Sequence, residues 1–559
     1  MFDSGSVAVA SEPIAPTLRP MGVYAMAGLA LEADQPLPCL LSIDRVRGYL
    51  LRLDPRMGNT MVLNPRQVEA WLDVTDLCLA GDHLWFTQGC QVFYCDRMTL
   101  VPTLFAELPY PANGIAVWES LVYVTCQKSG YIHSFARETG TFVAKFPQPG
   151  VGTETLCVDG DHLWVCDRLE QTVYCCDRAT GEVCYSALTP FSSPTGIAFC
   201  PGEGGRDICY IAYAQEEPYL RDDPNGEAVG GDPFELAWRD RTFVHPLYMK
   251  TVPAEHYTLS NGYLVELSYV EELLPLEAVT INQVVWRIAL PSDTLRQRVR
   301  HVEAIGHPLE IEEQDGQKVA VFRFDQIQPF QGGLFGWRVV MEMYGLKYCL
   351  TPQVAGDEAL PEEMQERYLV DDDELAMDSE VIQRAARSAV GTETNVLRKM
   401  LKIRNYVYDR LSYGIQPKID TPDVALARGV GSCGEYVGVI LALARLSGIA
   451  CRTIGRYKCP AHNDRFGVPL EPEFNHVWIE FYLPGVGWLP MESNVDDVIE
   501  RGPYPERFFM GLAWFHTEIG KGISFEKMRA ADLPESVRMG DLAINHIRFR
   551  ILEELVPYL

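Results

Sequence analysis

The chain has 559 residues, of which 47% are hydrophobic and 22% charged, and its formal net charge is −28. That length exceeds what one hydrophobic core supports and predicts two to four domains. So acidic a chain repels phosphate backbones and anionic lipids, which argues against nucleic acid or a membrane surface as a partner. The sequence holds no apolar run of 18 residues, so it predicts no membrane-spanning helix.

Residues 1–20 lack a basic start followed by an apolar core, so we expect a loose leader and not a signal peptide. Sixteen cysteines are present, and several, such as Cys166 and Cys209, stand in strand-like apolar runs where a free thiol behaves as a small hydrophobe. Without an export signal, the simplest prediction is a cytoplasmic protein without disulfides.

A short pattern recurs about every 40 residues in the first half of the chain. It is clearest as GDHLWF at 81–86 and GDHLWV at 160–165, two periods apart, with LVYV at 121–124 between them. A second pattern, CDR at 95–97, FAR at 135–137 and CDR at 176–178, keeps the same spacing. Short alternating strands with this period are typical of β-propeller blades, which bury their faces only against neighbouring blades in a ring. We therefore expect a propeller of five or six blades over residues 21–270.

The last expected blade is degenerate and ends near residues 261–265, and the polar segment 215–232 breaks the period as a surface insertion. The Asp-Arg-x-Thr-Gly turn at Asp177–Gly181 resembles NHL and streptogramin-lyase-like propellers, a likeness of architecture that does not imply a function. His83 and His162 occupy equivalent positions and are expected to be turn residues. The repeats hold no clustered acid, base and nucleophile, so we expect the propeller to recruit a protein partner or substrate and not to catalyse.

Longer alternating segments follow over residues 279–355 and predict a small antiparallel β-sandwich. It resembles the sandwich that precedes the catalytic domain in bacterial transglutaminase-like proteins. Residues 356–378 are rich in Asp and Glu, which is typical of a solvated linker. The remaining residues, 379–559, are expected to form an α+β domain that carries the chemistry.

Cys433 is the candidate nucleophile. It follows the glycine-rich stretch Gly429–Ser432 and precedes an apolar run of helical spacing, Val437–Leu446. We therefore expect it in the first turn of a largely buried helix, where free N–H groups and the helix dipole stabilise a thiolate.

The candidate base, His476, lies in a predicted hairpin. Residues 475–483 alternate as a strand, and a Pro-Gly turn at 484–487 returns the chain into a second strand that ends at Glu492. A carboxylate on the second strand can reach a histidine on the first, and a catalytic thiol needs both a base and a partner that orients it. Glu492 is the expected partner, with Asn494, Asp496 and Asp497 as alternatives.

These stretches together resemble the transglutaminase-like superfamily, over about residues 396–494. The nucleophile helix is matched by GSCGEY at 431–436, and the histidine and acid strands by NHVWIE at 475–480 and GWLPME at 487–492. The resemblance implies a papain-like α+β fold that acts on a protein or peptide substrate as a cysteine protease, amidohydrolase or acyltransferase. It implies no cofactor, since bacterial members have no general need for calcium.

One departure from the family leaves a second function open. The family usually has Asp where this chain has Glu492, and a misplaced carboxylate is poorly tolerated in catalysis. The alternative is therefore a catalytically inactive scaffold or binding protein.

Other chemical candidates carry less weight. Cys459 and His462 have a metal-like spacing but no second pair, so no metal site is expected. The Cys433 backbone N–H is the first expected oxyanion donor, and Tyr413 is expected to be a packed aromatic. His516 and His546 stand outside any such motif.

Overall fold

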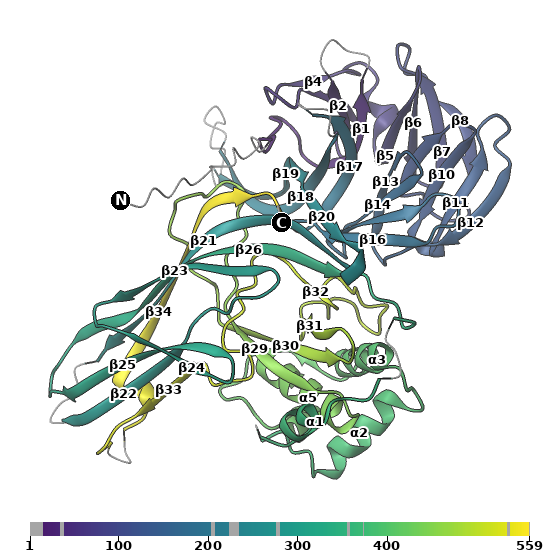
Figure 1. Ribbon diagram of the computed structural model, residues 1–559. Helices are drawn as coiled ribbons and strands as arrows, with labels where there is room; N and C mark the ends of the chain where they lie inside the picture. The colour runs from purple at the N-terminus through teal and green to yellow at the C-terminus, as the bar shows by residue number, and fades with distance from the viewer. Residues whose placement is uncertain are drawn as a thin grey trace, which may run out of the picture.

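The computed structural model describes residues 15–33, 38–202, 207–222, 234–274, 280–354, 358–372, 374–533 and 537–557. Most of the leader, part of the expected insertion at 215–232 and parts of the acidic linker lie outside these ranges. In Figure 1 the propeller lies at the upper right, the sandwich extends to the lower left, and the helices lie at the bottom.

The first half of the chain forms the predicted β-propeller, in which the described residues make five antiparallel sheets. The ring is closed because β1 lies beside both β5 and β17. The strands are β1 (Met26–Glu32), β2 (Cys39–Asp44), β3 (Tyr49–Leu53), β4 (Thr60–Val62), β5 (Val74–Ala80), β6 (His83–Gln88), β7 (Gln91–Asp96), β8 (Thr103–Glu107), β9 (Ile115–Trp118), β10 (Leu121–Cys126), β11 (Tyr131–Ala136), β12 (Phe142–Pro147), β13 (Thr153–Asp159), β14 (His162–Asp167), β15 (Thr172–Asp177), β16 (Val183–Leu188), β17 (Pro194–Pro201), β18 (Asp207–Asp222) and β19 (Phe234–Leu247).

The recurring residues have structural roles in these blades. Trp85 and Trp164 are buried on β6 and β14, the second strands of their blades. Asp96 and Asp177 end the third strands, and each carboxylate accepts the N–H groups of the residues two and three positions on. An Asp that closes such a turn joins the third strand to the fourth, which explains why the pattern repeats once per blade.

The sandwich takes strands from more of the chain than residues 279–355. The strand β21, which includes the degenerate repeat at 261–265, lies between β26 and β34 and not in a propeller blade. Likewise β33 pairs with β22, so residues near the C-terminus complete both sheets. The strands are β20 (Met249–Val252), β21 (Tyr257–Leu273), β22 (Ile281–Ala289), β23 (Gln297–Ile305), β24 (Glu310–Gln314), β25 (Gln317–Ile327), β26 (Gly333–Tyr348), β32 (Gly511–Leu512), β33 (Glu526–Arg529) and β34 (Ala543–Leu555).

These assignments differ from the predicted boundaries for a physical reason. The alternation of β21 suits any half-buried strand, and its distance from the preceding repeat resembles the blade period. Because β17 closes the ring against β1, β21 is left to pair with β26. The pairing with β34 joins residues nearly 300 positions apart, and no local pattern encodes such a partner.

Parts of the leader and of the acidic linker are attached to the domains. Leu18 is buried and bridges Val244 of β19. Within the linker, α1 (Glu362–Tyr368) places the Tyr368 ring 5.0 Å from that of Trp488, and Asp372 forms an ion pair with Arg445. Instead of being fully exposed to solvent, as the sequence predicts, the described part of the acidic linker therefore packs partly against the α+β domain.

The α+β domain packs helices on one face of a three-stranded sheet with the order β29-β30-β31. Helix α5 contacts β29 and β30, and its buried side chains form one core with those of α2 and α3. The elements are α2 (Glu380–Val390), α3 (Val396–Tyr408), β27 (Ser412–Tyr413), α4 (Pro422–Arg428), β28 (Val430–Gly431), α5 (Cys433–Leu446), β29 (Cys451–Arg456), β30 (His476–Leu483) and β31 (Gly487–Met491). The short helix α6 (Met539–Leu542) lies against β34 of the sandwich.

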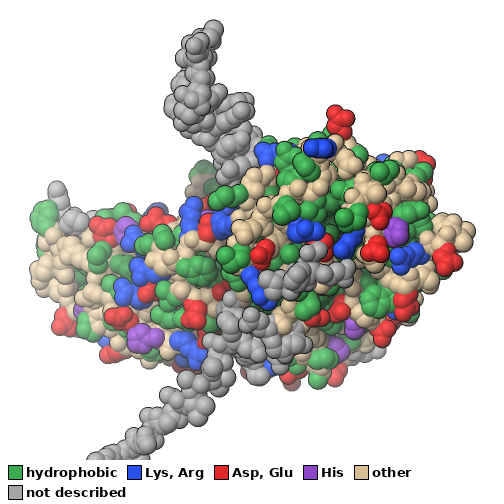
Figure 2. Space-filling view, turned by 90° about the horizontal axis from the view of Figure 1, so that it is seen from above, with side chains coloured by type: hydrophobic (Ala, Val, Ile, Leu, Met, Phe, Trp, Pro, Cys, Tyr) green, Lys and Arg blue, Asp and Glu red, His purple; other side chains and the backbone are tan. Residues whose placement is uncertain are grey.

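Among the helices of the described residues, none has the length and apolar character to cross a bilayer. On the face of the molecule seen in Figure 2, acidic side chains are spread among basic and hydrophobic ones and do not gather in one area. The net negative charge is therefore not concentrated on that face.

Candidate active site

Cys433 is the first residue of α5, as its sequence context predicts. The Glu435 carboxylate accepts the backbone N–H of Ser432 at 2.8 Å and so fixes the start of the helix. Arg428 from α4 donates to the same carboxylate at 3.1 Å. The thiol therefore lies at the N-terminal end of α5, toward which the free backbone N–H groups of the first turn are directed.

The environment of Cys433 favours a thiolate. Burial alone would raise its pKa, but interaction with the His476 imidazole and the Val477 backbone N–H brings it below the usual 9.0. Burial instead raises the pKa of Cys95 to about 12 and that of Cys200 to about 11. The Cys433 thiol therefore ionises more readily than an ordinary thiol, whereas burial keeps the thiols of Cys95 and Cys200 protonated.

The two nitrogens of His476 face different groups. Nε2 donates to Glu492, at 2.8 and 3.0 Å from the two carboxylate oxygens. Nδ1 is buried and has no well-aligned hydrogen-bond partner among the described residues, so it is the nitrogen left to serve the thiol. Burial alone would lower the pKa of His476, but the adjacent Glu492 charge raises it above 6.5.

Glu492 follows β31 and is almost fully buried. Burial disfavours its charged form, yet His476 and Lys458 hold its pKa well below the ordinary value. The carboxylate is therefore an anion that stabilises a positive imidazole beside the thiol.

Two further side chains contact Glu492 that sequence reasoning missed. His516 places Nε2 2.7 Å from Oε1, and the Lys458 ammonium lies 2.6 Å from the same oxygen. His516 stands outside any sequence motif, yet it is one of the groups that contact the catalytic acid candidate. It lies 24 residues beyond Glu492 in irregular chain, where no sequence signal marks it.

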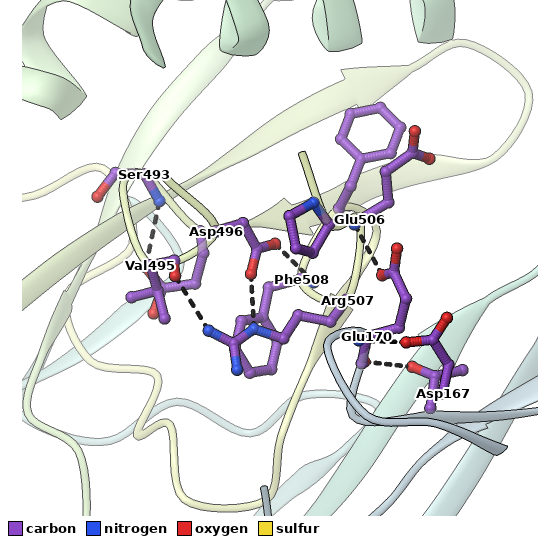
Figure 3. Close-up of polar contacts among 12 residues, drawn as sticks. Asp167, Glu170, Ser493, Val495, Asp496, Glu506, Arg507 and Phe508 are labelled. Atoms are coloured by element: carbon purple, nitrogen blue, oxygen red, sulfur yellow. Dashed lines mark hydrogen bonds and ion pairs between the residues drawn. The ribbon is translucent and has the colours of Figure 1, made fainter. Parts of the chain in front are cut away.

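The alternative acids lie elsewhere in this region. Asp496 accepts from Arg507 Nε at 2.6 Å and from the Phe508 backbone N–H at 3.2 Å, as Figure 3 shows. Asp497 accepts from the Tyr436 hydroxyl at 2.6 Å. Asn494 accepts the Ser493 hydroxyl at 2.9 Å. Among these candidates, Glu492 is the one with a hydrogen bond to His476.

Large apolar side chains stand exposed around the thiol and the imidazole. Tyr413 is 46% exposed, not packed as expected, and its pKa is raised by burial and by the nearby Cys433 charge. Ile419 is 71% exposed and covers Gly434, where an added Cβ would meet its Cδ1 at 2.8 Å. The Phe474 ring is 51% exposed and lies 6.3 Å from that of His476. We call these three side chains the apolar rim.

In the part of the chain that the structure describes, no group of three or more His, Cys, Asp or Glu side chains is placed to hold a metal.

No curated protein matches the sequence. Similar solved structures include a candidate cysteine protease from Cytophaga hutchinsonii (13% identity, 53% of this chain and 93% of the other, TM-score 0.36). Others are Myxococcus xanthus glutaminyl cyclase (13%, 42% and 96%, TM-score 0.29) and a streptogramin B lyase (14%, 40% and 72%, TM-score 0.25). At such TM-scores these likenesses carry no argument.

The family comparison is more specific. Residues 383–493 match the model of the transglutaminase-like superfamily, a stretch that contains Cys433, His476 and Glu492. It confirms the resemblance that the motifs predict, and residues 383–493 of this chain are accordingly a transglutaminase-like domain.

Proposed function

We propose that the protein is a thiol enzyme that transfers acyl groups from carboxamide or peptide bonds of a protein or peptide substrate, with Cys433, His476 and Glu492 as its triad. The observation that carries this proposal is the thiol at a helix start with a lowered pKa, beside an imidazole whose far nitrogen is bound by a buried carboxylate. A purely structural cysteine has no need of such an environment.

The geometry supports a two-step reaction. The Cys433 thiolate attacks the carbonyl carbon, and the Cys433 backbone N–H at the start of α5 stabilises the oxyanion. The His476 imidazolium gives its Nδ1 proton to the departing amine or ammonia, which leaves a thioester on sulfur. Water or a second amine then attacks the thioester, His476 takes up its proton, and the Cys433 thiolate is released, which restores the starting ion pair.

The apolar rim supports a peptide substrate with an apolar side chain next to the reacting carbonyl. Exposed apolar side chains near a nucleophile are stabilised when a ligand removes them from water. Tyr413, Ile419 and Phe474 are therefore proposed to contact the residues that flank the scissile bond.

The enzyme proposal is tested by the reactivity of the thiols. With iodoacetamide at pH 7, Cys433 is expected to react at least about tenfold faster than the exposed Cys184, because each unit of lowered pKa increases the thiolate fraction about tenfold. The rate at Cys433 should level off below pH 9, the ordinary thiol value. Peptide mass spectrometry over a time course measures both sites in one sample.

Equal rates at the two cysteines would instead favour the inactive scaffold. The His476→Ala variant is the control, since it should slow Cys433 and leave Cys184 unchanged. This comparison separates an activated thiol from one that is merely accessible.

We further propose that the propeller recruits the protein substrate through a groove between its second and third blades. The groove encloses about 680 Å³, and Trp85, Leu104, Phe105 and Arg137 are among its lining residues. Leu104 is half exposed, so Leu104→Asp should leave the fold intact. We expect KM for a protein substrate such as casein to rise about fivefold, as for the loss of ~1 kcal/mol at an interface, while kcat stays the same.

Val143→Asp is the matched control, because Val143 on β12 is equally exposed but does not line the groove. Equal KM values for the two variants would contradict the proposal that the propeller groove binds the substrate. Truncation before residue 279 cannot replace this test, since it deletes β21 from the middle of a sandwich sheet.

A further inference from the structure

The segment from Ser493 to Ile519, between β31 and β33, contacts the propeller. The Trp514 indole N–H donates to the Pro190 carbonyl at 2.9 Å, and Leu188 belongs to one apolar cluster with Phe508. The backbone N–H of Glu506 donates to the Glu170 carboxyl group at 2.7 Å, a contact that Figure 3 shows between the two domains. The fourth blade and the loop that follows its last strand thus contact this segment at three places.

The sandwich holds the same segment through two buried cations. Arg296 donates to the carbonyl oxygens of Ala513, Trp514 and His516 at 2.8, 3.2 and 2.9 Å. Lys347 donates to three more carbonyls at 2.5–3.2 Å, those of Glu506, Arg507 and Phe509. A cation that binds several carbonyls at once fixes the path of irregular chain.

His516 is the residue of this segment whose side chain binds the Glu492 carboxylate. Two backbone contacts accompany it, since the Ser493 N–H donates to Oε2 at 3.1 Å and the Glu492 N–H donates to the Phe508 carbonyl at 3.1 Å. His516 is fully buried, with Phe515 stacked 4.7 Å from its ring and Trp478 5.2 Å away. Burial and the charge of Lys458 lower its pKa to about 3, so the ring is neutral and its Nε2–H donates to Glu492. The Ala513 carbonyl lies 3.2 Å from Nδ1 but already accepts the His516 backbone N–H and Arg296. Nδ1 is therefore not required as a donor, and the ring proton is assigned to Nε2.

This contact explains how a Glu at position 492 can orient His476 although the family usually has the shorter Asp there. The extra methylene gives the carboxylate another rotatable bond and more positions to adopt. His516 and Lys458 both bind Oε1, which leaves Oε2 as the nearer oxygen to His476, at 2.8 Å. With Oε1 held from the far side, the longer side chain keeps one orientation.

We propose that His516 is a positioning residue that holds the Glu492 carboxylate against His476, and that the propeller and the sandwich keep His516 in place by binding the segment that carries it. This inference rests on the proposed function, since it concerns the same triad. It makes the propeller part of the support of the active site in addition to any role in recruitment.

The test is the pH dependence of Cys433 alkylation in the full-length His516→Leu variant. Without the His516 donor, Glu492 turns toward Lys458, the imidazolium loses its counter-charge and the thiol pKa rises. We expect the iodoacetamide rate at pH 6.5 to fall about tenfold, the equivalent of one pKa unit, and to recover above pH 9. The charged and titratable groups that face this site are His476, Glu492, Lys458, Arg296 and Tyr413.

Two variants separate positioning from simple loss of stability. His516→Gln retains an N–H donor of similar reach and should restore the wild-type profile to within about threefold. His245→Leu removes another buried histidine bound to a glutamate that is not part of the triad, with Nε2 2.9 Å from Glu554. It should lower the melting temperature as His516→Leu does and leave the alkylation profile unchanged.

The support from the propeller is tested by Trp514→Phe, which keeps the ring beside Tyr263 at 4.0 Å but removes the N–H bound to Pro190. A smaller shift in the same direction as His516→Leu is expected, about twofold to threefold at pH 6.5. An unchanged Cys433 alkylation rate in Trp514→Phe would contradict the part of the proposal in which the propeller keeps His516 in place.

The outcomes distinguish this inference from the proposed function. If wild-type Cys433 reacts no faster than Cys184, the enzyme proposal itself fails. If wild-type Cys433 is activated but His516→Leu leaves its pKa unchanged or lowers it, the positioning role alone is overturned. A shift as large in His245→Leu would likewise overturn it.

Discussion

Cys433→Ala and His476→Ala are each expected to abolish acyl transfer, with losses of kcat on the order of 10⁶-fold, and the double variant is expected to be hardly worse than either one. The nucleophile and its base act as a unit, so their losses do not add. The measurement is hydrolysis of casein and incorporation of a labelled amine into casein, with mass spectrometry to locate the acyl adduct on sulfur.

Cys451→Ala and His462→Ala are the controls for this prediction. Cys451 is buried on β29 beside the hairpin, and His462 lies in the same domain outside the triad. Both variants should keep activity near the wild-type level. An adduct on Cys451 or Cys459, or activity that survives Cys433→Ala, would contradict the enzyme proposal at its centre.

Glu492→Gln is expected to lower kcat about 10³-fold to 10⁴-fold, by analogy with orienting acids in other triads. The amide cannot stabilise the imidazolium, and its N–H₂ group can turn toward His476 and favour the wrong tautomer. Because the Glu492 charge raises the pKa of His476, its loss should lower that pKa and raise that of Cys433. Activity near pH 6.5 should therefore fall more than activity near pH 9.

The matched controls are Asp496→Asn and Asp497→Asn. Asp496 binds Arg507, and Asp497 binds Tyr436, so each substitution should affect stability more than the pH profile. If either variant is inactive while Glu492→Gln is silent, the wrong carboxylate has been assigned. Glu492→Asp, which keeps the charge but shortens the side chain, should show an intermediate loss.

The active-site elements were predictable because their signals are local. A glycine-rich stretch before an apolar helical run predicts a helix that starts at Cys433. A Pro-Gly turn between alternating segments predicts the hairpin that brings Glu492 to His476. The propeller was predictable for a similar reason, since each blade closes its own turn with an Asp and the pattern returns at every blade.

The sandwich boundaries and the surroundings of Glu492 were not predictable in this way. The nucleophile helix, the histidine hairpin and the blade repeat follow from the amino-acid sequence alone, because neighbouring residues set helix starts, turns and strand alternation. The pairing of β34 with β21 and the contacts of His516 and Lys458 with Glu492 arise in the folded protein and have no local signal. Those contacts join residues far apart in the chain. They form because a buried carboxylate or an unpaired strand edge costs free energy unless its polar groups are hydrogen-bonded once the domains pack together.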